Sequence, residues 1–407
     1  MINVNNKKYN SNKSNPVVII CMDGTSFDYY EGAKEVMPNL WRIIETGTMG
    51  IVDSVIPSFT NPNNMAMVTG VSPAENGICG NFYFDPDLDE EVMMNEPRYL
   101  CADSILASFS QQGKKVAVVT SKDKLRKMLS HNLKGICFSI EFADQVSQEN
   151  NGISNVVDEL MHKRNPDIYD PDNSVYLIEV GVRLLEREHF DLMYLTSTDF
   201  VQHKNAPGSE GANSFLAGID HWIGELDKLG AVVVVTADHG MQDKTNSEGR
   251  PNVRFLEDIL IGKGIRSARV ILPITDPYVV HHGALGSYAT IYIDESEIES
   301  ATNILKQLDG VEDVLTRVEA AERFELPKDR IGDLVITADK HTVLGHAADR
   351  HDLEKVQVGL RSHGGVHESR VPIIINRQLK EKYKQRLESG QAKSREVFDF
   401  AINGTED

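Results

Sequence analysis

Short apolar runs that are rich in β-branched residues alternate with helical patterns along most of this chain. The runs lie at 17–21, 50–55, 115–120, 136–140, 192–196, 231–236 and 371–375. Continuous apolar runs of this length, separated by helices, are typical of buried parallel strands. The helical patterns lie at 38–46, 102–112, 154–163, 174–188 and 214–229, and Gly230 follows the last of them as a helix-terminating residue. The pattern predicts an α/β fold.

The pattern changes between about residues 255 and 360. Strand-like segments at 268–274, 289–293 and 333–337 surround a helical pattern at 296–308, and the core pattern resumes at 371–375. This predicts a smaller α+β cap inserted into the sheet domain. We therefore expect a core formed by residues 15–255 and 360–407 and a cap formed by residues 256–359. A continuation of the same sheet is the alternative.

Composition and charge narrow the function classes. The 407 residues include 41% hydrophobic residues, which suits two or three domains or one large domain with an insertion. The 42 basic and 61 acidic residues give a net charge of −19, which repels nucleic acid and anionic membrane surfaces. Neither is an expected partner.

The cysteines and the N-terminal region indicate a cytoplasmic protein. The four cysteines lie far apart and include no C-x-x-C pair, so we expect reduced thiols and neither a disulfide framework nor a zinc–thiolate site. The apolar run at 17–22 is too short for a signal sequence or a membrane span. A homodimer is an open alternative to a monomer.

Polar residues of metal-binding type follow three of the apolar runs. Asp23 follows the run at 17–22, Asp199 follows 192–197, and Asp238-His239 follows 231–237. In a doubly wound sheet, ligands bind beyond the carboxyl ends of the strands. One such Asp alone is usually a helix cap or a turn residue, but three together, two of them paired with His, indicate a metal site.

The spacing of these residues supports metal binding. Asp199 and His203 are four apart, which places both side chains on one face of a helical turn. Asp238 and His239 are adjacent and need an irregular strand end, for which we expect Gly240 to supply the backbone freedom. Carboxylate and imidazole ligands without thiolate suit Zn²⁺ or Mn²⁺ better than Mg²⁺. A further ligand is expected from His363 or His367, which lie in one Gly-rich segment.

A candidate nucleophile lies in the segment 58–64, which reads S-F-T-N-P-N-N. A helix is predicted at 65–69 with Pro62 in its first turn, which places Thr60 at a helix N-terminus. Free backbone N–H groups there favour an alkoxide and an incoming anion. The alternative is that Thr60 or Asn61 only caps the helix. A site for two metal ions with N and O ligands is typical of phosphoryl transfer.

Taken together, these motifs resemble the alkaline phosphatase superfamily. Within its nucleotide pyrophosphatase-like branch, the chain is similar to the phosphonoacetate hydrolases, and the resemblance runs from Asp23 to His363. It implies an alkaline phosphatase-like core with a mixed, mostly parallel sheet flanked by helices. It also implies two Zn²⁺ ions, one held by Asp23, Thr60, Asp238 and His239 and the other by Asp199, His203 and His363. His363 is preferred to His367 because the ligand of the superfamily is followed by Gly.

The resemblance also implies how phosphonoacetate is bound and cleaved. Thr60 attacks phosphorus to form a phosphothreonine, and acetate and phosphate are released. Asn81 and His203 are expected to face the substrate, with a turn residue beside Gly80 as the alternative for Asn81. Lys122 and Lys124 are expected to bind the substrate carboxylate, and they would lie on one face if the backbone there is extended. Their alternative is the solvated face of a helix.

Two rival functions remain open at this stage. A phosphodiesterase or nucleotide pyrophosphatase would use the same metal site but needs an aromatic slot for a base, which Phe82, Tyr83 and Tyr194 could supply. The other rival is a non-catalytic anion-binding protein on the same fold. The complete ligand set and the nucleophile argue against it.

Overall fold

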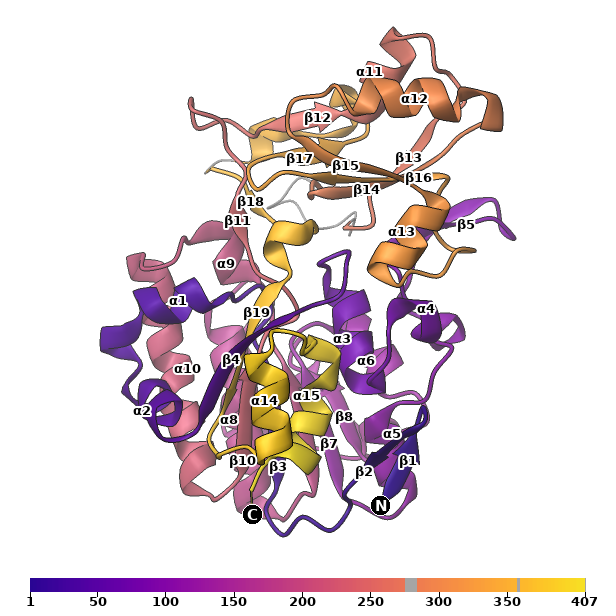
Figure 1. Cartoon of the computed structure of the whole chain (residues 1–407). Coiled ribbons are helices and arrows are strands. Elements are labelled where there is room, and N and C mark those ends of the chain that lie inside the picture. Colours follow the sequence, from indigo (N-terminus) through magenta and orange to yellow (C-terminus); the bar gives the residue numbers. More distant parts are fainter. Residues whose placement is uncertain (275–283, 357–358, 407) are drawn as a thin grey trace.

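The seven apolar runs form one sheet. In the computed structural model, which describes residues 1–274, 284–356 and 359–406, this sheet has seven strands (Figure 1). In spatial order the strands are β4 (Thr48–Asp53), β19 (Arg370–Ile375), β10 (Val232–Thr236), β3 (Val17–Cys21), β9 (Leu192–Thr196), β7 (Val116–Thr120) and β8 (Ile136–Ser139). Neighbours from β10 to β8 pair in parallel, whereas β19 is antiparallel to both β10 and β4. The expected mixed, mostly parallel sheet is confirmed.

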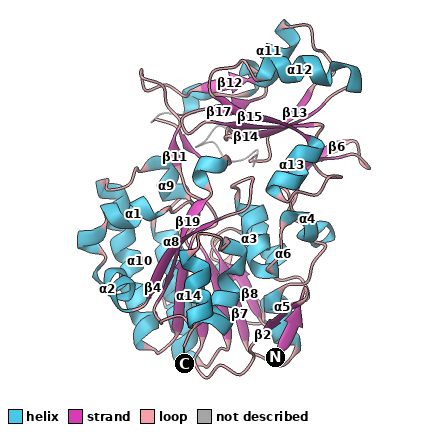
Figure 2. Cartoon of the chain, in the orientation of Figure 1, coloured by secondary structure: helices cyan, strands magenta, loops and turns pink. Residues whose placement is uncertain are grey.

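Helices cover both faces of the central sheet, as Figure 2 shows. Alternate residues of β3 enter two separate hydrophobic clusters, with Ile19 in one and Val18 and Ile20 in the other. Such alternation is expected for a strand buried on both faces. The Ile20 face packs against α1 (Phe27–Gly32), α2 (Pro38–Thr46), α8 (Asp172–Arg187) and α10 (Glu210–Lys228). The Ile19 face packs against α3 (Thr60–Thr69), α5 (Ile105–Gln111), α6 (Asp123–Leu129), α14 (Glu381–Glu388) and α15 (Val397–Asp399).

Most of the predicted helices are present, with one exception. Gly230 follows α10 with a φ of +81°, as expected for its terminating role. The predicted helix at 154–163 is wrong, because only a π-helical turn forms at Val156–Met161. Asn155 and His162 bound this turn in the left-handed conformation. These left-handed residues interrupt the helical backbone at both ends, so the helix cannot extend across 154–163.

The polar N-terminal region is more ordered than its composition suggests. It forms the hairpin of β1 (Ile2–Val4) and β2 (Lys7–Tyr9), whose Val4 and Tyr9 side chains are buried. Asn5 and Asn6 both have positive φ, which is the conformation that tight hairpin turns favour.

A second, antiparallel sheet lies beyond the carboxyl ends of the central strands (Figure 1). Its order is β13 (Arg269–Ile271), β14 (Tyr288–Tyr292), β16 (Leu334–Ala338) and β15 (Val311–Thr316). It is accompanied by α11 (Leu256–Gly262), α12 (Ile298–Leu305) and α13 (Arg317–Phe324). The elements β15 and α13 were not expected from the sequence. The boundaries 255/256 and 359/360 of the cap stay a prediction.

Shorter strand pairs and helices complete the described chain. The pairs are β5 (Phe82–Asp85) with β6 (Glu90–Met93), β11 (Gln242–Asp243) with β18 (Arg361–Ser362), and β12 (Val253–Phe255) with β17 (Val343–Gly345). The remaining helices are α4 (Pro73–Asn76), α7 (Gln148–Asn151) and α9 (Phe200–Lys204). Among the helices of the described residues, none is both long and apolar enough to cross a membrane. The cytoplasmic location and the homodimer stay predictions.

A buried ion pair joins the core to the segment that carries His363. Lys244 Nζ lies 2.8 Å from Glu368 Oε1 and donates to the Lys340 carbonyl at 2.9 Å, and neither side chain of the pair is exposed. Glu368 Oε2 accepts from the backbone N–H of Gly365 at 2.9 Å. The pair therefore connects the segments that contain Lys244, Lys340 and Gly365.

Removing one partner of this pair should destabilise the fold strongly. We expect Lys244→Met to lower the free energy of unfolding by about 3–5 kcal/mol, because it leaves a buried carboxylate without its counter-charge. The matched control is Lys393→Met, whose partner Asp53 and own side chain are each 40% exposed. Its loss should stay below about 1 kcal/mol. Urea denaturation measures both, and equal losses would contradict this interpretation.

Candidate metal centre and nucleophile

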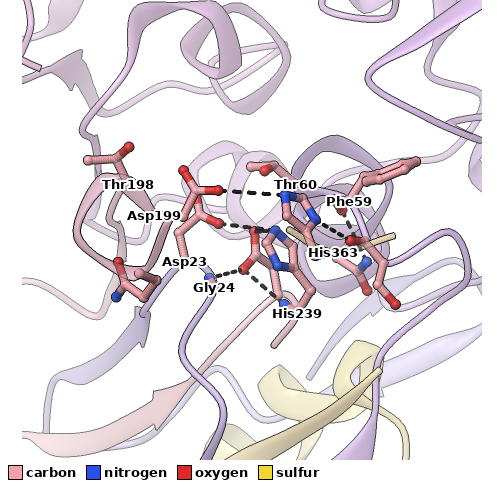
Figure 3. A network of polar contacts seen from close by, with 12 residues as sticks. Asp23, Gly24, Phe59, Thr60, Thr198, Asp199, His239 and His363 are labelled. Carbon is pink, nitrogen blue, oxygen red and sulfur yellow. Dashed lines mark hydrogen bonds and ion pairs between the residues drawn. The ribbon is translucent and has the colours of Figure 1, made fainter. Parts of the chain in front are cut away.

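Three neighbouring strands bring three aspartates to one edge of the sheet. Asp23 follows β3, Asp199 follows β9 and Asp238 follows β10, and each is 5% exposed or less. Figure 3 shows Asp23 and Asp199 together with Thr60, His239 and His363. Three buried carboxylates at one edge of the sheet repel one another, so they require positive charge nearby.

Each of the three histidines in the cluster is oriented by a backbone carbonyl. Nδ1 of His203 lies 2.7 Å from the Arg361 carbonyl, Nδ1 of His363 lies 2.7 Å from that of Ser58, and Nδ1 of His239 lies 2.9 Å from that of Gly240. A carbonyl can only accept, so Nδ1 carries the hydrogen in each ring. Nε2 is therefore the nitrogen that faces the cluster, and in the neutral ring its lone pair can bind a metal ion, as in most metal-binding imidazoles.

The ligand atoms form two overlapping groups. Asp199, His203 and His363 form one group and Asp23, Asp199 and His239 the other, with the ligand atoms of each group within 4.8 Å of one another. Within the first group, Asp199 Oδ2 lies 2.9 Å from His203 Nε2 and 3.7 Å from His363 Nε2. Asp199 thus lies between the two halves of the centre.

The second group contains buried atoms that have no hydrogen-bond partner. Asp23 Oδ1 and His239 Nε2 are 3.2 Å apart, and neither makes a hydrogen bond with the described residues. Unsatisfied polar atoms at this depth are costly. A divalent cation bound by both would satisfy them, so the residues present fit a metal ion.

Asp238 is held differently from the other two aspartates. Its Oδ1 accepts from the backbone N–H groups of Gly24 at 3.2 Å and His239 at 3.0 Å, and its Oδ2 accepts from Asn64 Nδ2 at 3.2 Å. Asp238 Oδ2 lies 3.8 Å from His239 Nε2. Each carboxylate oxygen has two lone pairs, so Oδ2 can still bind a metal ion.

Burial and neighbouring charges shift the pKa values of three groups in the cluster. Burial, together with the charges of Asp199 and Asp238, raises the pKa of Asp23 to about 7. Burial opposes protonation of His239, but the charges of Asp238 and Asp23 raise its pKa to about 10. Burial and the neighbouring His239 hold the pKa of His363 well below its usual range. The same carboxylates that raise the pKa of His239 would stabilise a bound cation.

The glycine that matters at this edge is Gly24 rather than Gly240. Gly24 has a φ of +67°, and a Cβ atom there would lie 3.0 Å from Asp199 Cβ. Gly240 is not in the left-handed region, so our expectation for it is wrong. A Cβ atom at Gly240 would lie 3.1 Å from Ser26 Cβ, so a larger residue there would crowd Ser26.

Thr60 is the first residue of α3, which begins five residues earlier than the predicted helix. Pro62 lies in the first turn, as expected. Asn64 Nδ2 donates to the Thr60 carbonyl at 3.0 Å as well as to Asp238, and Asn64 Oδ1 accepts from Tyr194 Oη at 2.6 Å. One buried amide therefore fixes the start of α3 against a candidate metal ligand.

Asn81 is oriented by the same helix start. Its Oδ1 accepts from the backbone N–H of Asn61 at 2.8 Å, so its NH₂ group is the end that remains to donate to another group. Its backbone is fixed by bonds to Pro273 and Met94. Among the backbone N–H groups at this helix N-terminus, that of Asn61 is not available to an anion, because it donates to Asn81.

The two lysines lie where strand β7 leads into α6. Lys122 immediately precedes α6, and its Nζ lies 3.5 Å from Asp199 Oδ1. Lys122 has an extended backbone, but Lys124 lies within α6. The backbone is therefore not extended at both lysines. Lys122 contacts the cluster through an ion pair with one of its carboxylates, which a solvated helix face would not do.

Of the remaining candidates, His367 lies on the surface, and Tyr194 reaches the cluster only through Asn64. His367 pairs with Glu312 at 2.9 Å and its side chain is 36% exposed, whereas His363 is buried. Tyr194 is fully buried beneath α3, and Tyr83 Oη donates to Asp85 at 2.8 Å. Both tyrosine side chains are buried, so neither is exposed to stack on a nucleotide base, as the phosphodiesterase alternative requires.

One family model and several solved structures are similar to most of this chain. A family model described as type I phosphodiesterase / nucleotide pyrophosphatase matches residues 17–367. Among solved structures, the chain is similar to phosphonoacetate hydrolase from Sinorhizobium meliloti 1021 in complex with phosphonoacetate. The two share 45% identity with a TM-score of 0.92 over 99% of this chain and 98% of that one.

More distant relatives share the fold. Murine ectonucleotide pyrophosphatase/phosphodiesterase 5 matches with a TM-score of 0.64 and 18% identity, over 96% of this chain and 95% of that one. An ectonucleotide pyrophosphatase/phosphodiesterase of Caenorhabditis elegans is 40% identical over 81 residues, which is 19% of this chain and 10% of that protein. Family member 3 of Rattus norvegicus is 24% identical over 60% of this chain and 26% of its own length. The chain thus spans only a minor part of these curated relatives.

Proposed function

This chain belongs to the type I phosphodiesterase and nucleotide pyrophosphatase family, and from that premise we propose that it hydrolyses the carbon–phosphorus bond of phosphonoacetate to acetate and phosphate. The observation that carries the proposal is the likeness to the Sinorhizobium meliloti phosphonoacetate hydrolase along 99% of the chain. The position of Lys122 beside the metal cluster supports it, because phosphonoacetate carries a carboxylate as well as a phosphonate.

We propose Zn²⁺ as the metal, with two ions per chain. One would be held by Asp23, Thr60, Asp238 and His239, and the other by Asp199, His203 and His363. The presence of three imidazoles favours Zn²⁺ over Mg²⁺. When bound, the ions would lower the pKa of the Thr60 hydroxyl and neutralise the oxygens of the phosphonate.

The first chemical step transfers the phosphoryl group to Thr60. The Thr60 oxygen attacks phosphorus, a P–O bond forms, and the P–C bond breaks with its electron pair passing to carbon. The Asn81 NH₂ group, fixed by the bond to Asn61, donates to a phosphoryl oxygen in this step. The product on the protein is a phosphothreonine.

The leaving group determines where positive charge is needed. The electron pair on carbon is stabilised by delocalisation into the carboxylate, which gives the leaving group enediolate character. Lys122 and Lys124 would bind this carboxylate more tightly as its negative charge grows, which accelerates the step. The carbanion takes up one proton at carbon to give acetate, which balances the proton released by the Thr60 hydroxyl. Water then cleaves the phosphothreonine, so that its oxygen ends in phosphate and the Thr60 hydroxyl is restored.

A comparison of substrates tests this proposal against the phosphodiesterase alternative. The zinc-loaded protein should have a higher kcat/KM for phosphonoacetate than for a nitrophenyl phosphodiester, because only phosphonoacetate offers a carboxylate to the lysines. Phosphonopyruvate and 2-aminoethylphosphonate measure how strictly that carboxylate is required. Faster cleavage of the diester, with no turnover of phosphonoacetate, would favour the phosphodiesterase.

Metal analysis tests the composition of the centre. We expect about two zinc ions per purified chain, loss of activity after chelation, and recovery when zinc is restored. His363→Ala should lose one ion, because its Nε2 faces Asp199. The matched control His367→Ala should keep both, since His367 pairs with Glu312 on the surface. A single ion in the unaltered protein, or equal losses in the two variants, would contradict this assignment.

A further inference from the structure

We propose that Arg361 is a positioning residue that sets the affinity of the metal site formed by Asp199, His203 and His363. This inference rests on the proposed function, because it takes that cluster as one of the two metal sites. Arg361 lies outside the cluster and acts through the segments that carry the ligands.

Arg361 belongs to the ribbon through which the chain leaves and re-enters the core. This ribbon consists of β11 and β18, in which Gln242 pairs with Ser362 and Asp243 with Arg361 (Figure 1). The strand β11 begins three residues after His239, and β18 ends immediately before His363. The ribbon therefore joins two ligand segments at its base.

The main chain and the side chain of Arg361 bind different parts of the centre. Its carbonyl accepts the Nδ1–H of His203 at 2.7 Å, a contact that any residue at this position could make. Its side chain makes further contacts: Nε donates to the Gln202 carbonyl at 3.0 Å, and Nη2 donates to Tyr29 Oη at 3.2 Å and to the Met241 carbonyl at 3.4 Å. One guanidinium thus connects α9 to the turn that follows His239.

The contacts to α9 matter because that helix is short. The helix α9 spans five residues, so its last carbonyl groups lack partners within the helix. Arg361 and Tyr29 supply donors at this end of the helix. Tyr29 Oη lies 3.1 Å from the Gln202 carbonyl oxygen and 2.7 Å from that of Asn205, and its one hydrogen can donate to either. A positive charge at a helix C-terminus is also favourable.

The position of α9 determines the geometry of one metal site. Asp199 caps α9 and His203 lies within it, so a rotation of this helix moves two ligands relative to His363. The planar fork of arginine can hold several acceptors in a fixed arrangement, which the single ammonium of lysine cannot do. The Arg361 side chain therefore fixes the site by holding α9 against the ribbon.

Zinc titration of the metal-free full chain tests this role without measuring activity. Competition with a chromophoric chelator gives the affinity of each site, and His363→Ala identifies the site that contains His363. Arg361→Met should weaken that site by about 10- to 100-fold. The site with Asp23 and His239 should change by much less. Arg361→Lys should show a smaller loss at the same site.

The control is Arg377→Met, which removes another partly buried arginine bound to backbone carbonyls. Arg377 donates to the Asn376 carbonyl at 3.0 Å and to the Gly230 carbonyl at 3.2 Å, near the N-terminal end of β10. We expect it to leave both zinc affinities unchanged. The proposal would be overturned if Arg361→Met weakened both zinc sites equally or weakened neither. It would also be overturned if Arg377→Met lost as much zinc affinity at the His363 site as Arg361→Met.

The lysine variant decides the question if Arg361→Met does not fold. In that case selective weakening of the His363 site in Arg361→Lys supports the positioning role, and unchanged binding in this variant overturns it. An unaltered chain that binds no zinc would instead count against the proposed function, so the two failures are distinguishable.

Discussion

Thr60→Ala should reduce the turnover of phosphonoacetate by about 10³-fold or more, because it removes the proposed nucleophile. Thr60 is the first residue of α3 and belongs to the same cluster as Asp199 and His363 (Figure 3). The variant should fold and bind metal nearly normally, because the start of α3 is held by the Asn64 side chain. The rate of phosphate release under saturating substrate measures the loss.

Two further variants make this test specific to the nucleophile. Thr60→Ser keeps a hydroxyl group at the same position and should retain part of the activity. Thr69→Val removes a hydroxyl from the other end of the same helix, where it donates to the Met65 carbonyl, and should cost only a few-fold at most. Near-normal activity in Thr60→Ala would show that water, rather than Thr60, attacks phosphorus.

Lys122→Met should lower kcat/KM for phosphonoacetate by about 30- to 1,000-fold, which corresponds to about 2–4 kcal/mol for one charge-assisted contact in a closed site. The net charge of the chain is −19, so local cations are needed to hold the substrate carboxylate. Lys122 Nζ lies 3.5 Å from Asp199 and is therefore placed beside the metal cluster. Lys124→Met should act in the same direction.

The matched control for these variants is Lys127→Met, in the same helix α6. Lys127 pairs with Glu96 and its side chain is 51% exposed, so its loss should leave kcat/KM unchanged. Slow hydrolysis of an activated phosphate ester without a carboxylate should also be nearly unchanged in Lys122→Met. Equal losses on both substrates would indicate a general electrostatic or folding role. No loss on either substrate would mean that Lys122 does not bind the carboxylate.

The central sheet could be predicted from the sequence because its strands are buried on both faces. Runs such as 17–21 and 231–235 are apolar throughout and need no tertiary information to be recognised. Partly exposed elements were harder to find. The strand β15 contains two adjacent acidic residues, Glu312 and Asp313, and only one of its residues, Val314, is fully buried. The N-terminal hairpin places a few apolar residues in a polar segment.

Candidate ligands could be found from the sequence because strand ends mark them. Asp23, Asp199 and Asp238 each follow an apolar run, and parallel strands place such residues at one edge. The supporting residues could not be found in this way. Asn64 and Arg361 act through backbone carbonyls and a carboxylate that lie far away in the chain, and these contacts exist only in the folded protein.

The local backbone also limited what the sequence could tell. The extended conformation considered for Lys122 and Lys124 fails because α6 begins between them, at Asp123. Similarly, a glycine after Asp238-His239 suggested backbone freedom there, yet the left-handed glycine lies beside Asp23. Both errors arise because sequence patterns locate elements better than they locate element boundaries.

Phosphorus NMR of the zinc-loaded protein with phosphonoacetate tests the central claim most directly, because it shows which bond is broken. We expect the phosphonate signal to be replaced by that of inorganic phosphate, with an equal amount of acetate in the proton spectrum. The Thr60→Ala variant, at equal zinc content, should leave the phosphonate signal in place over the same time. An unchanged phosphonate signal with the zinc-loaded protein would contradict the account. So would the formation of methylphosphonate, because it would show loss of the carboxylate with the carbon–phosphorus bond intact.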